Sequence, residues 1–208
     1  MRKNLVWAFL LSLIVASGRA EAGTPAAAAA DPWKWLSNTY WYVPTQYLPA
    51  IASSPSLQAP IPVSDQTVYY IQHYQAGYFW GTTAVSYTTQ QSQEATTPSC
   101  LQLVGSVTPE GKLHLTFTPL PSTQVASPTP TPSSDSTSEP TVGIGTMVLQ
   151  HGAWTMENQM STTATGSLLL THWAYMYQCK PEEPCFSTLP GVGTSIPNFL
   201  GPCLVPLG

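Results

Sequence analysis

The middle of the sequence, from about residue 38 to residue 178, is built of short segments in which apolar and polar side chains alternate. Leu113, Leu115 and Phe117, for example, are separated by single polar residues. Alternation of this kind is typical of a strand that buries one face, because successive side chains point to opposite sides of a sheet. No segment shows a convincing helical period. The sequence therefore predicts an all-β fold.

The alternating segments number about eight, and short reversals join most of them. Glycine or proline stands where three of the reversals are expected, at Ala76-Gly77, at Thr108-Pro109-Glu110-Gly111 and at His151-Gly152. The expected strands cover residues 38–43, 66–74, 78–87, 101–107, 113–118, 142–150, 153–161 and 167–178.

An antiparallel meander of eight strands is most simply closed as an up-and-down barrel. A two-sheet β-sandwich would use the same strands and remains the alternative. Gly81, Gly143 and Gly145 fall inside expected strands, where glycine commonly permits a bend. Because a closed barrel needs such bends, these glycines favour the barrel.

The first 22 residues have the pattern of a signal peptide. Arg2 and Lys3 precede an apolar run from Leu5 to Ala16, and Ala20-Glu21-Ala22 matches a cleavage site after Ala22. The run is about 12 residues long, whereas a membrane-spanning helix needs about 20. A retained membrane anchor is the alternative. We expect cleavage, and a secreted or periplasmic mature protein without a membrane span.

Charged residues make up only 8% of the chain, with 6 basic and 10 acidic side chains. Removal of the signal peptide would leave three lysines and nine acidic residues, a formal net charge of −6. Proteins that bind nucleic acid need a basic patch for the phosphates, and this chain has too few cations to form one. Nucleic acid is therefore not an expected partner.

The four cysteines all lie after the signal peptide, and an even number in an exported chain favours disulfides. Four cysteines allow three connectivities. We favour Cys179 with Cys185, which closes a small loop, and Cys100 with Cys203, which attaches the C-terminal residues to the body. The other two connectivities stay open. The chain has no C-x-x-C pair, so a zinc site is not expected.

Composition divides the rest of the chain into segments. Residues 23–34 are alanine-rich and are interpreted as a flexible spacer, and residues 35–178 as the barrel domain. Residues 121–140 are nearly all Ser, Thr and Pro, which predicts a disordered loop inserted in the barrel, with a linker between two domains as the alternative. Residues 179–208 are rich in Pro and Gly and are expected to pack on the barrel as a tail.

The strand pattern resembles that of the calycin group, which comprises the lipocalin- and avidin-type barrels. The segment Thr39-Tyr40-Trp41-Tyr42-Val43-Pro44 is similar to the G-x-W segment that opens lipocalins, although the glycine is missing. The later lipocalin motifs and a clear C-terminal helix are missing too. The resemblance covers residues 35–178 as a pattern of strands, and it implies a fold rather than a function.

Motifs of known catalytic sites are missing from the sequence, among them G-x-S-x-G, H-E-x-x-H and a phosphate-binding loop. Of the four histidines only His172 is expected to face inward, and a hydrogen-bonded wall residue is the commoner role for such a side chain. We therefore expect a protein that is not an enzyme and that holds neither a cofactor nor a metal ion.

The segment from Ala153 to Ser161 places Asn158 between Met156 and Met160 on an apolar face. A buried amide needs hydrogen-bond partners, so Asn158 is expected either to orient a ligand in the barrel or to bond a neighbouring strand or a buried water. By alternation, the residues predicted to line the ligand site are Tyr70, Trp80, Met156, Asn158 and Trp173.

These patterns predict an exported binding protein that holds a small apolar or amphipathic molecule inside a barrel. The rival hypothesis is a β-sandwich that binds carbohydrate or the cell envelope through exposed aromatic side chains, since aromatic residues occupy both faces of the segment from Tyr78 to Tyr87. A structural envelope protein is the third possibility. The discriminating observation is whether the strands close.

Overall fold

The computed structural model describes residues 31–44, 49–53, 58–89, 98–120, 140–164 and 168–204, which belong to one compact unit beginning at Asp31. Its described elements are nine strands and four short helices. In chain order they are η1 (Lys34–Leu36), β1 (Thr39–Tyr42), β2 (Pro49–Ser53), β3 (Ile61–Gln75), β4 (Tyr78–Thr89), β5 (Ser99–Val107), β6 (Lys112–Pro119), β7 (Thr141–Gln150), β8 (Ala153–Ala164), β9 (Leu168–Cys179), α1 (Pro184–Ser187), α2 (Ile196–Leu200) and η2 (Gly201–Cys203).

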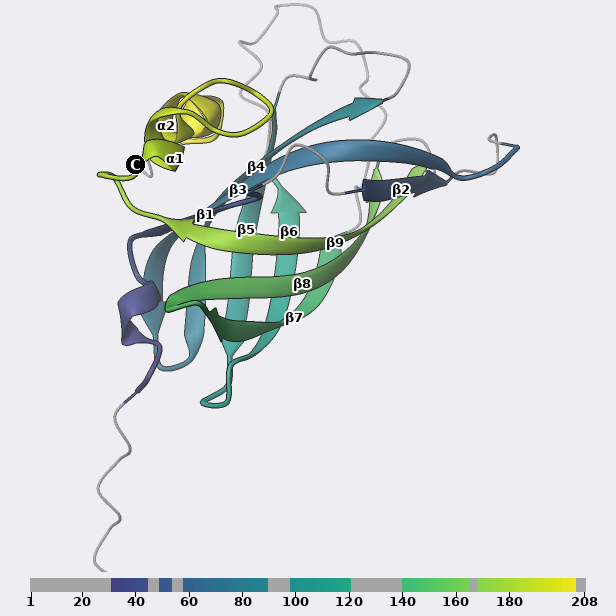
Figure 1. The fold of residues 1–208 in the computed structure, drawn as a ribbon. Helices are drawn as coiled ribbons and strands as arrows, with labels where there is room; N and C mark the ends of the chain where they lie inside the picture. The colour runs from purple at the N-terminus through teal and green to yellow at the C-terminus, as the bar shows by residue number, and fades with distance from the viewer. Residues whose placement is uncertain are drawn as a thin grey trace, which may run out of the picture. The chain divides into compact units, whose positions relative to one another are not determined.

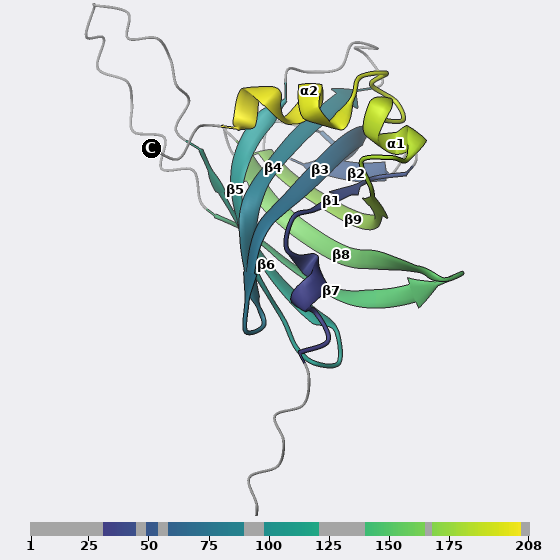
Figure 2. The same ribbon diagram turned by 90° about the vertical axis from the view of Figure 1, so that its left-hand side faces the viewer.

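All the strands pair antiparallel in one sheet that closes on itself (Figures 1 and 2). Consecutive strands from β3 to β9 are neighbours, and the first strand segments pair with both β3 and β9. Closure removes the free edges that two separate sheets would have. The predicted closed meander is therefore confirmed, and the sandwich alternative is wrong.

The nine strands occupy eight positions around the barrel, because β1 and β2 both lie between β3 and β9. Tyr42 pairs with Val68 and Pro49 pairs with Ser64, so between these two pairings the sequence advances by seven positions on this edge and by four on β3. An insertion of this kind interrupts a strand without changing its neighbours. The eight-stranded meander predicted from the sequence is confirmed, although β2 was not anticipated.

The strands are strongly staggered around the barrel. Paired residues can be followed from His73 of β3 across each neighbouring strand in turn, all the way around the barrel. This line returns to β3 at Pro62 and not at His73. A stagger of this size tilts the strands against the barrel axis, as closure of eight strands requires. The tilted strands are visible in Figure 2.

The barrel has two distinct ends. At one, which we call the short-turn end, the reversals are Ala76-Gly77, residues 108–111 and His151-Gly152, each with a glycine at positive φ. At the other, the far end, β3 begins and β4, β6 and β8 end.

The segment before β1 packs inside the short-turn end. Trp33 and Leu36 are buried, and the Trp33 indole N–H donates to the Thr108 carbonyl oxygen at 2.8 Å. Ring contacts at 4.9–6.1 Å join four tryptophans, which we call the tryptophan cluster; its members are Trp33, Trp35, Trp41 and Trp154. Because Trp33 belongs to this core, the barrel unit begins at Asp31, and the spacer predicted over residues 23–34 extends too far.

The C-terminal segment (residues 180–204) packs on the outside of the barrel (Figure 2). Leu189, Ile196 and Phe199 form a buried cluster with Val68 of β3 and Ala84 of β4. The side chain of Gln66 donates to the Pro190 carbonyl oxygen at 2.8 Å and so ties this segment to β3.

Two disulfides hold the C-terminal segment, and both were predicted. Cys100 of β5 is bonded to Cys203, and Cys179 of β9 is bonded to Cys185. Disulfides are typical of proteins in an oxidising environment outside the cytoplasm. The expected signal peptide (residues 1–22) and most of the Ser/Thr/Pro segment (residues 121–139) lie outside the described residues. Among the described residues, no helix is long and apolar enough to cross a membrane.

Candidate functional site

The interior of the barrel changes character from one end to the other. Toward the short-turn end it is filled by buried apolar side chains, including Phe79, Leu113 and Met156. Toward the far end and around the middle, buried polar residues share the inward faces of four strands. They are Asp65 and Thr67 on β3, Thr83 on β4, Thr141 on β7 and Asn158 on β8.

Asn158 is the most informative of these residues. Its side chain is only 1% exposed and lies between Met156 and Met160, which face the same core. Neither the amide nitrogen nor the amide oxygen has a hydrogen-bond partner among the described residues. An unpaired buried polar group costs about 1–3 kcal/mol, so this amide is the polar group of the interior that most needs an explanation.

The strands on either side of Asn158 carry the smallest side chains. Its paired residues are Gly145 on β7 and Ala174 on β9. A Cβ atom on Gly145 would lie only 2.3 Å from the carbonyl oxygen of Glu157 and 3.0 Å from the Cβ of Asn158. Glycine is thus required for β7 to approach β8 here, and neither neighbour offers the amide a polar side chain.

A second polar group lies on β3 and β4. The Thr67 hydroxyl donates to an Asp65 carboxylate oxygen at 2.9 Å, and the Thr83 hydroxyl has no hydrogen-bond partner among the described residues. Thr83 pairs with Tyr69, whose side chain is completely buried. Two strands of the interior therefore present hydroxyl and carboxylate groups close to an aromatic ring.

Tyr69 connects this group with β8. Its hydroxyl donates to the Met160 sulfur at 3.2 Å, and its ring lies 5.4 Å from that of Phe117. Burial, and then the nearby Asp65 carboxylate, raise the pKa of Tyr69 well above its ordinary value. The phenol therefore stays protonated near neutral pH and remains a hydrogen-bond donor beside Met160, two residues from Asn158.

The structure separates the five predicted lining residues. Met156 and Asn158 face the interior, as predicted. Trp80 and Trp173 are 37% and 46% exposed on the outer face, and Tyr70 lies outside beneath the C-terminal segment, stacked on Tyr40. The predicted inward position of these three is wrong, because Phe79, Ala174 and Tyr69 beside them take the inner face.

Sequence reasoning missed Asp65, Thr67 and Thr83. On β3 and β4 the outward-facing residues Val68 and Ala84 are as buried as their inward neighbours, because the C-terminal segment covers them. Burial on both faces removes the alternation that assigns a side chain to one face. One feature of the sequence could have indicated this polar group. Asp65 and Thr67 are two residues apart, so in a strand both side chains lie on the same face.

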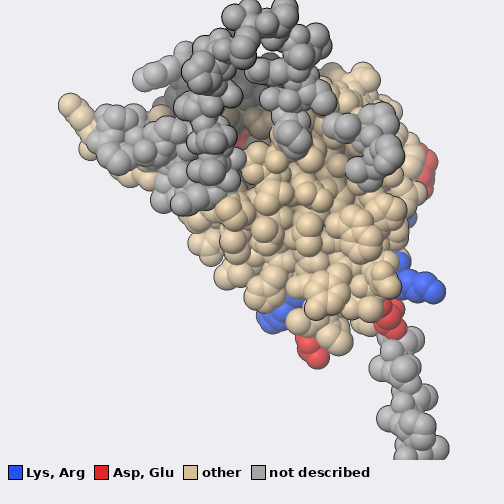
Figure 3. Space-filling view, turned by 180° about the vertical axis from the view of Figure 1, so that it is seen from behind, with Lys and Arg blue, Asp and Glu red and all other residues tan. Residues whose placement is uncertain are grey.

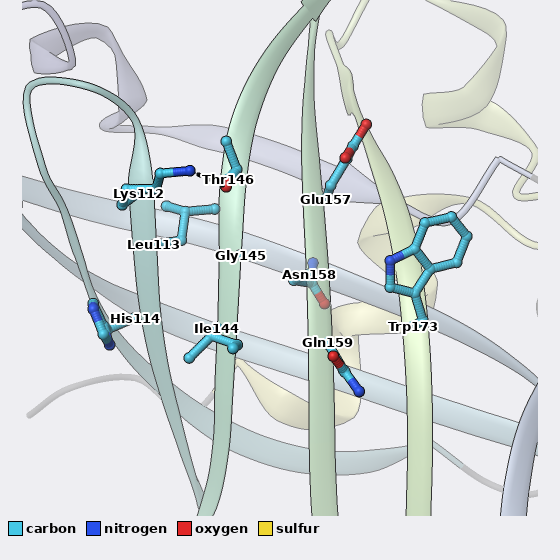
Figure 4. Close-up of a pocket in the computed structure, with 10 residues that line it drawn as sticks. All are labelled: Lys112, Leu113, His114, Ile144, Gly145, Thr146, Glu157, Asn158, Gln159 and Trp173. Carbon is cyan, nitrogen blue, oxygen red and sulfur yellow. Dashed lines mark hydrogen bonds between the residues drawn. The ribbon is translucent and has the colours of Figure 1, made fainter.

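A separate depression of about 460 Å³ lies over β6, β7, β8 and β9 (Figure 4). Most of its lining residues have side chains on the outer face of the sheet. They form two rows of paired residues across the strands, Lys112–Thr146–Glu157 and His114–Ile144–Gln159–Trp173. The inward-facing residues Leu113, Gly145 and Asn158 complete the lining. This depression and the polar interior are the two candidate sites.

Within the described residues, one group brings three potential metal ligands together, namely Cys179, Glu183 and Cys185. The two sulfurs are joined in a disulfide, so neither is a thiolate that could bind a metal ion. The group belongs to the covalent anchoring of the C-terminal segment.

The comparisons with known proteins add no family. No protein-family model matches the sequence, and no curated protein matches it significantly.

Proposed function

We propose that this protein is an exported, non-enzymatic binding protein that holds a small amphipathic ligand inside the barrel. The observation that carries the proposal is the buried, unpartnered amide of Asn158 between two methionines. Ligand pockets are mostly apolar and contain a few polar groups that orient the ligand. Asn158 has the surroundings of such a group.

The amide indicates what the ligand presents to it. Asn158 offers one acceptor oxygen and a donor nitrogen side by side. A carboxamide, or a hydroxyl beside a carbonyl, would satisfy both atoms at once. The adjacent Met156 and Met160 offer an adaptable apolar surface, because methionine has several rotatable bonds and a polarisable sulfur. The ligand would thus combine a small hydrogen-bonding head with an apolar body.

The direction of access follows from the contrast between the two ends. The tryptophan cluster fills the short-turn end, whereas Asp65, Thr67 and Thr83 lie on the inner wall toward the far end. A ligand would therefore enter from the far end and direct its head toward the middle of the barrel. The Thr83 hydroxyl offers a further hydrogen-bond partner along this route.

Two further observations agree with the proposal. The closed eight-position meander is consistent with the calycin resemblance, in whose lipocalin- and avidin-type members the interior is the ligand site. The two disulfides suit a protein that works in the periplasm or outside the cell, as the signal-peptide pattern predicts. Fold alone does not determine function, so the proposal depends on Asn158.

The test uses the oxidised full-length chain and a fluorescent apolar probe, 1-anilinonaphthalene-8-sulfonate. Decanamide, decanol and decanoate, which share one chain length, are added as competitors. We expect decanamide to displace the probe at the lowest concentration. We expect Asn158→Leu to weaken decanamide binding about tenfold, since two hydrogen bonds of modest net strength are lost.

Met156→Leu is the matched control, because it changes shape on the same face and removes no polar atom. It should retain decanamide affinity within about threefold, which corresponds to less than 1 kcal/mol. Failure of all three competitors to displace the probe, or equal affinities in the wild type and Asn158→Leu, would show that the interior is a structural core.

A further inference from the structure

The depression over β6 to β9 has no role in the proposed interior site. Its side chains point outward from two adjacent rows of paired residues. In Figure 4, Lys112 and His114 stand on one side, Glu157 and Trp173 on the other, and Ile144 with Gly145 lies between them. Polar groups therefore flank an apolar floor.

Trp173 provides the aromatic surface of this depression. The indole is 46% exposed, and Tyr175 contacts it edge-on with ring centroids 4.3 Å apart. An exposed indole held by a neighbouring ring presents a flat apolar surface with little conformational freedom to lose on binding. Ile144, which is 57% exposed, extends the apolar floor onto β7.

The polar groups of the depression supply both donors and acceptors. Lys112 donates to the Thr146 hydroxyl at 3.4 Å, and Glu157 accepts from the Gln150 side-chain amide at 2.8 Å. The ammonium and the carboxylate each have capacity for further hydrogen bonds. Gln159 and His114 are exposed and add an amide and an imidazole.

The charges in the depression balance, with one lysine and one glutamate among its lining residues. A nucleotide or an anionic lipid would require excess positive charge. Charge is sparse elsewhere too: the face shown in Figure 3 has few charged atoms among its described residues, and they lie mainly near its lower end and at its right-hand edge. A neutral, hydroxyl-rich ligand fits this chemistry better than an ion.

We propose that this depression is a binding site for a neutral saccharide. A pyranose ring has a face of C–H groups that packs on an indole, while its hydroxyls form hydrogen bonds at the rim. Here the C–H face would lie on Trp173, and the hydroxyls would bond Glu157 and Gln159. The depression of about 460 Å³ is within the usual range for small-molecule sites, roughly 300–1,000 Å³.

The shallow form of the site favours a segment of a polysaccharide chain over a wholly apolar molecule. An apolar ligand gains most when a pocket encloses it, but this depression is open, lies on the outside of the sheet and has polar side chains beside its apolar floor (Figure 4). A polymer segment can leave its other residues in solvent and still pack one ring on Trp173.

The test measures retention of the oxidised full-length chain on insoluble cellulose, chitin and peptidoglycan sacculi, with cellohexaose and chitohexaose as soluble competitors. We expect the wild type to be retained on at least one of these polymers. Trp173→Ala should weaken that retention at least tenfold, and Glu157→Gln should weaken it several-fold.

Trp80→Ala is the matched control, since Trp80 is exposed to a similar degree on β4 and stacks on His73 outside the depression. It should bind like the wild type, and all variants should keep their decanamide affinity, which separates this proposal from the interior site. Absence of wild-type retention on every polymer, or an equal loss in Trp80→Ala, would overturn the saccharide site.

Discussion

At the short-turn end, Trp33 and Leu36 pack inside the barrel, whereas toward the far end Leu189, Ile196 and Phe199 pack against its outer wall. The exposure of the outer wall follows the same division. Val68 and Ala84 are fully buried beneath the C-terminal segment, while Tyr78, near the short turn of the same hairpin, is 64% exposed. The two ends are thus stabilised from opposite sides of one sheet.

This difference explains how the interior can hold polar residues. Apolar burial is the main favourable term in folding, and it need not all lie inside the barrel. Burial of outer-wall residues beneath the C-terminal segment supplies apolar contacts where Asp65, Thr67 and Thr83 lie on the inside. Polar residues on the inner wall of the far half are therefore compatible with a stable fold.

The largest expected effect comes from releasing the outer covering. Cys100 and Cys203 are separated by 103 residues, and in the chain-entropy model a disulfide closing a loop of about 100 residues contributes about 4.7 kcal/mol. The double variant Cys100→Ser with Cys203→Ser should lose about that much free energy of unfolding, measured by urea denaturation.

The second disulfide is the internal control for this prediction. Cys179 and Cys185 are separated by only 6 residues, so the same model gives a contribution of about 2 kcal/mol. Replacing this pair with serines should therefore cost less than half as much. Equal losses for the two pairs would show that the length of the closed loop does not set how much each disulfide contributes.

The next largest effect comes from removing the internal packing at the short-turn end. Trp33 is 4% exposed, and replacement of a buried tryptophan by alanine typically costs about 3–5 kcal/mol. We expect Trp33→Ala to destabilise the protein by this amount and to increase hydrogen exchange in the hairpin of β5 and β6, where the indole bonds Thr108. A loss below about 1 kcal/mol, the size expected at an exposed site, would mean that the segment before β1 does not stabilise the barrel.

The contrast between the ends also determines what the sequence could predict. The hairpin of β5 and β6 was predicted correctly, because Leu113, Leu115 and Phe117 are buried while their alternate neighbours are exposed. Met156 and Asn158 were placed correctly for the same reason, since Gln159 beside them is exposed.

The prediction for Tyr70 failed because both faces of β3 are buried there, whereas Trp80 and Trp173 are large aromatic residues that the structure leaves partly exposed on the outer face. Tyr69 and Tyr70 are adjacent aromatic residues, one in the barrel core and one beneath the C-terminal segment. The sequence pattern therefore does not show which of the two side chains faces the interior. β2 was missed because its five residues, with proline and two alanines, have little strand character of their own. Its position depends on pairing with β3 and β9.

The smallest expected effect has the opposite sign and concerns the polar interior itself. Asn158→Leu replaces an unpartnered buried amide by an apolar side chain of similar size, so it removes a desolvation penalty of about 1–3 kcal/mol. In the absence of ligand we therefore expect this variant to be more stable than the wild type by about 1–2 kcal/mol, measured by urea denaturation. The same variant is expected to bind decanamide more weakly, so stability and binding should change in opposite directions.

That opposition is what separates a ligand site from a core polar residue. If Asn158 instead completes a hydrogen-bond network with the chain, Asn158→Leu leaves its partners unpaired and lowers the free energy of unfolding. Met156→Leu, which alters the same inward face of β8 without removing a polar atom, should change stability by less than about 1.5 kcal/mol. A destabilised Asn158→Leu beside a near-neutral Met156→Leu would show that the far half of the barrel, like the short-turn end, is stabilised from inside.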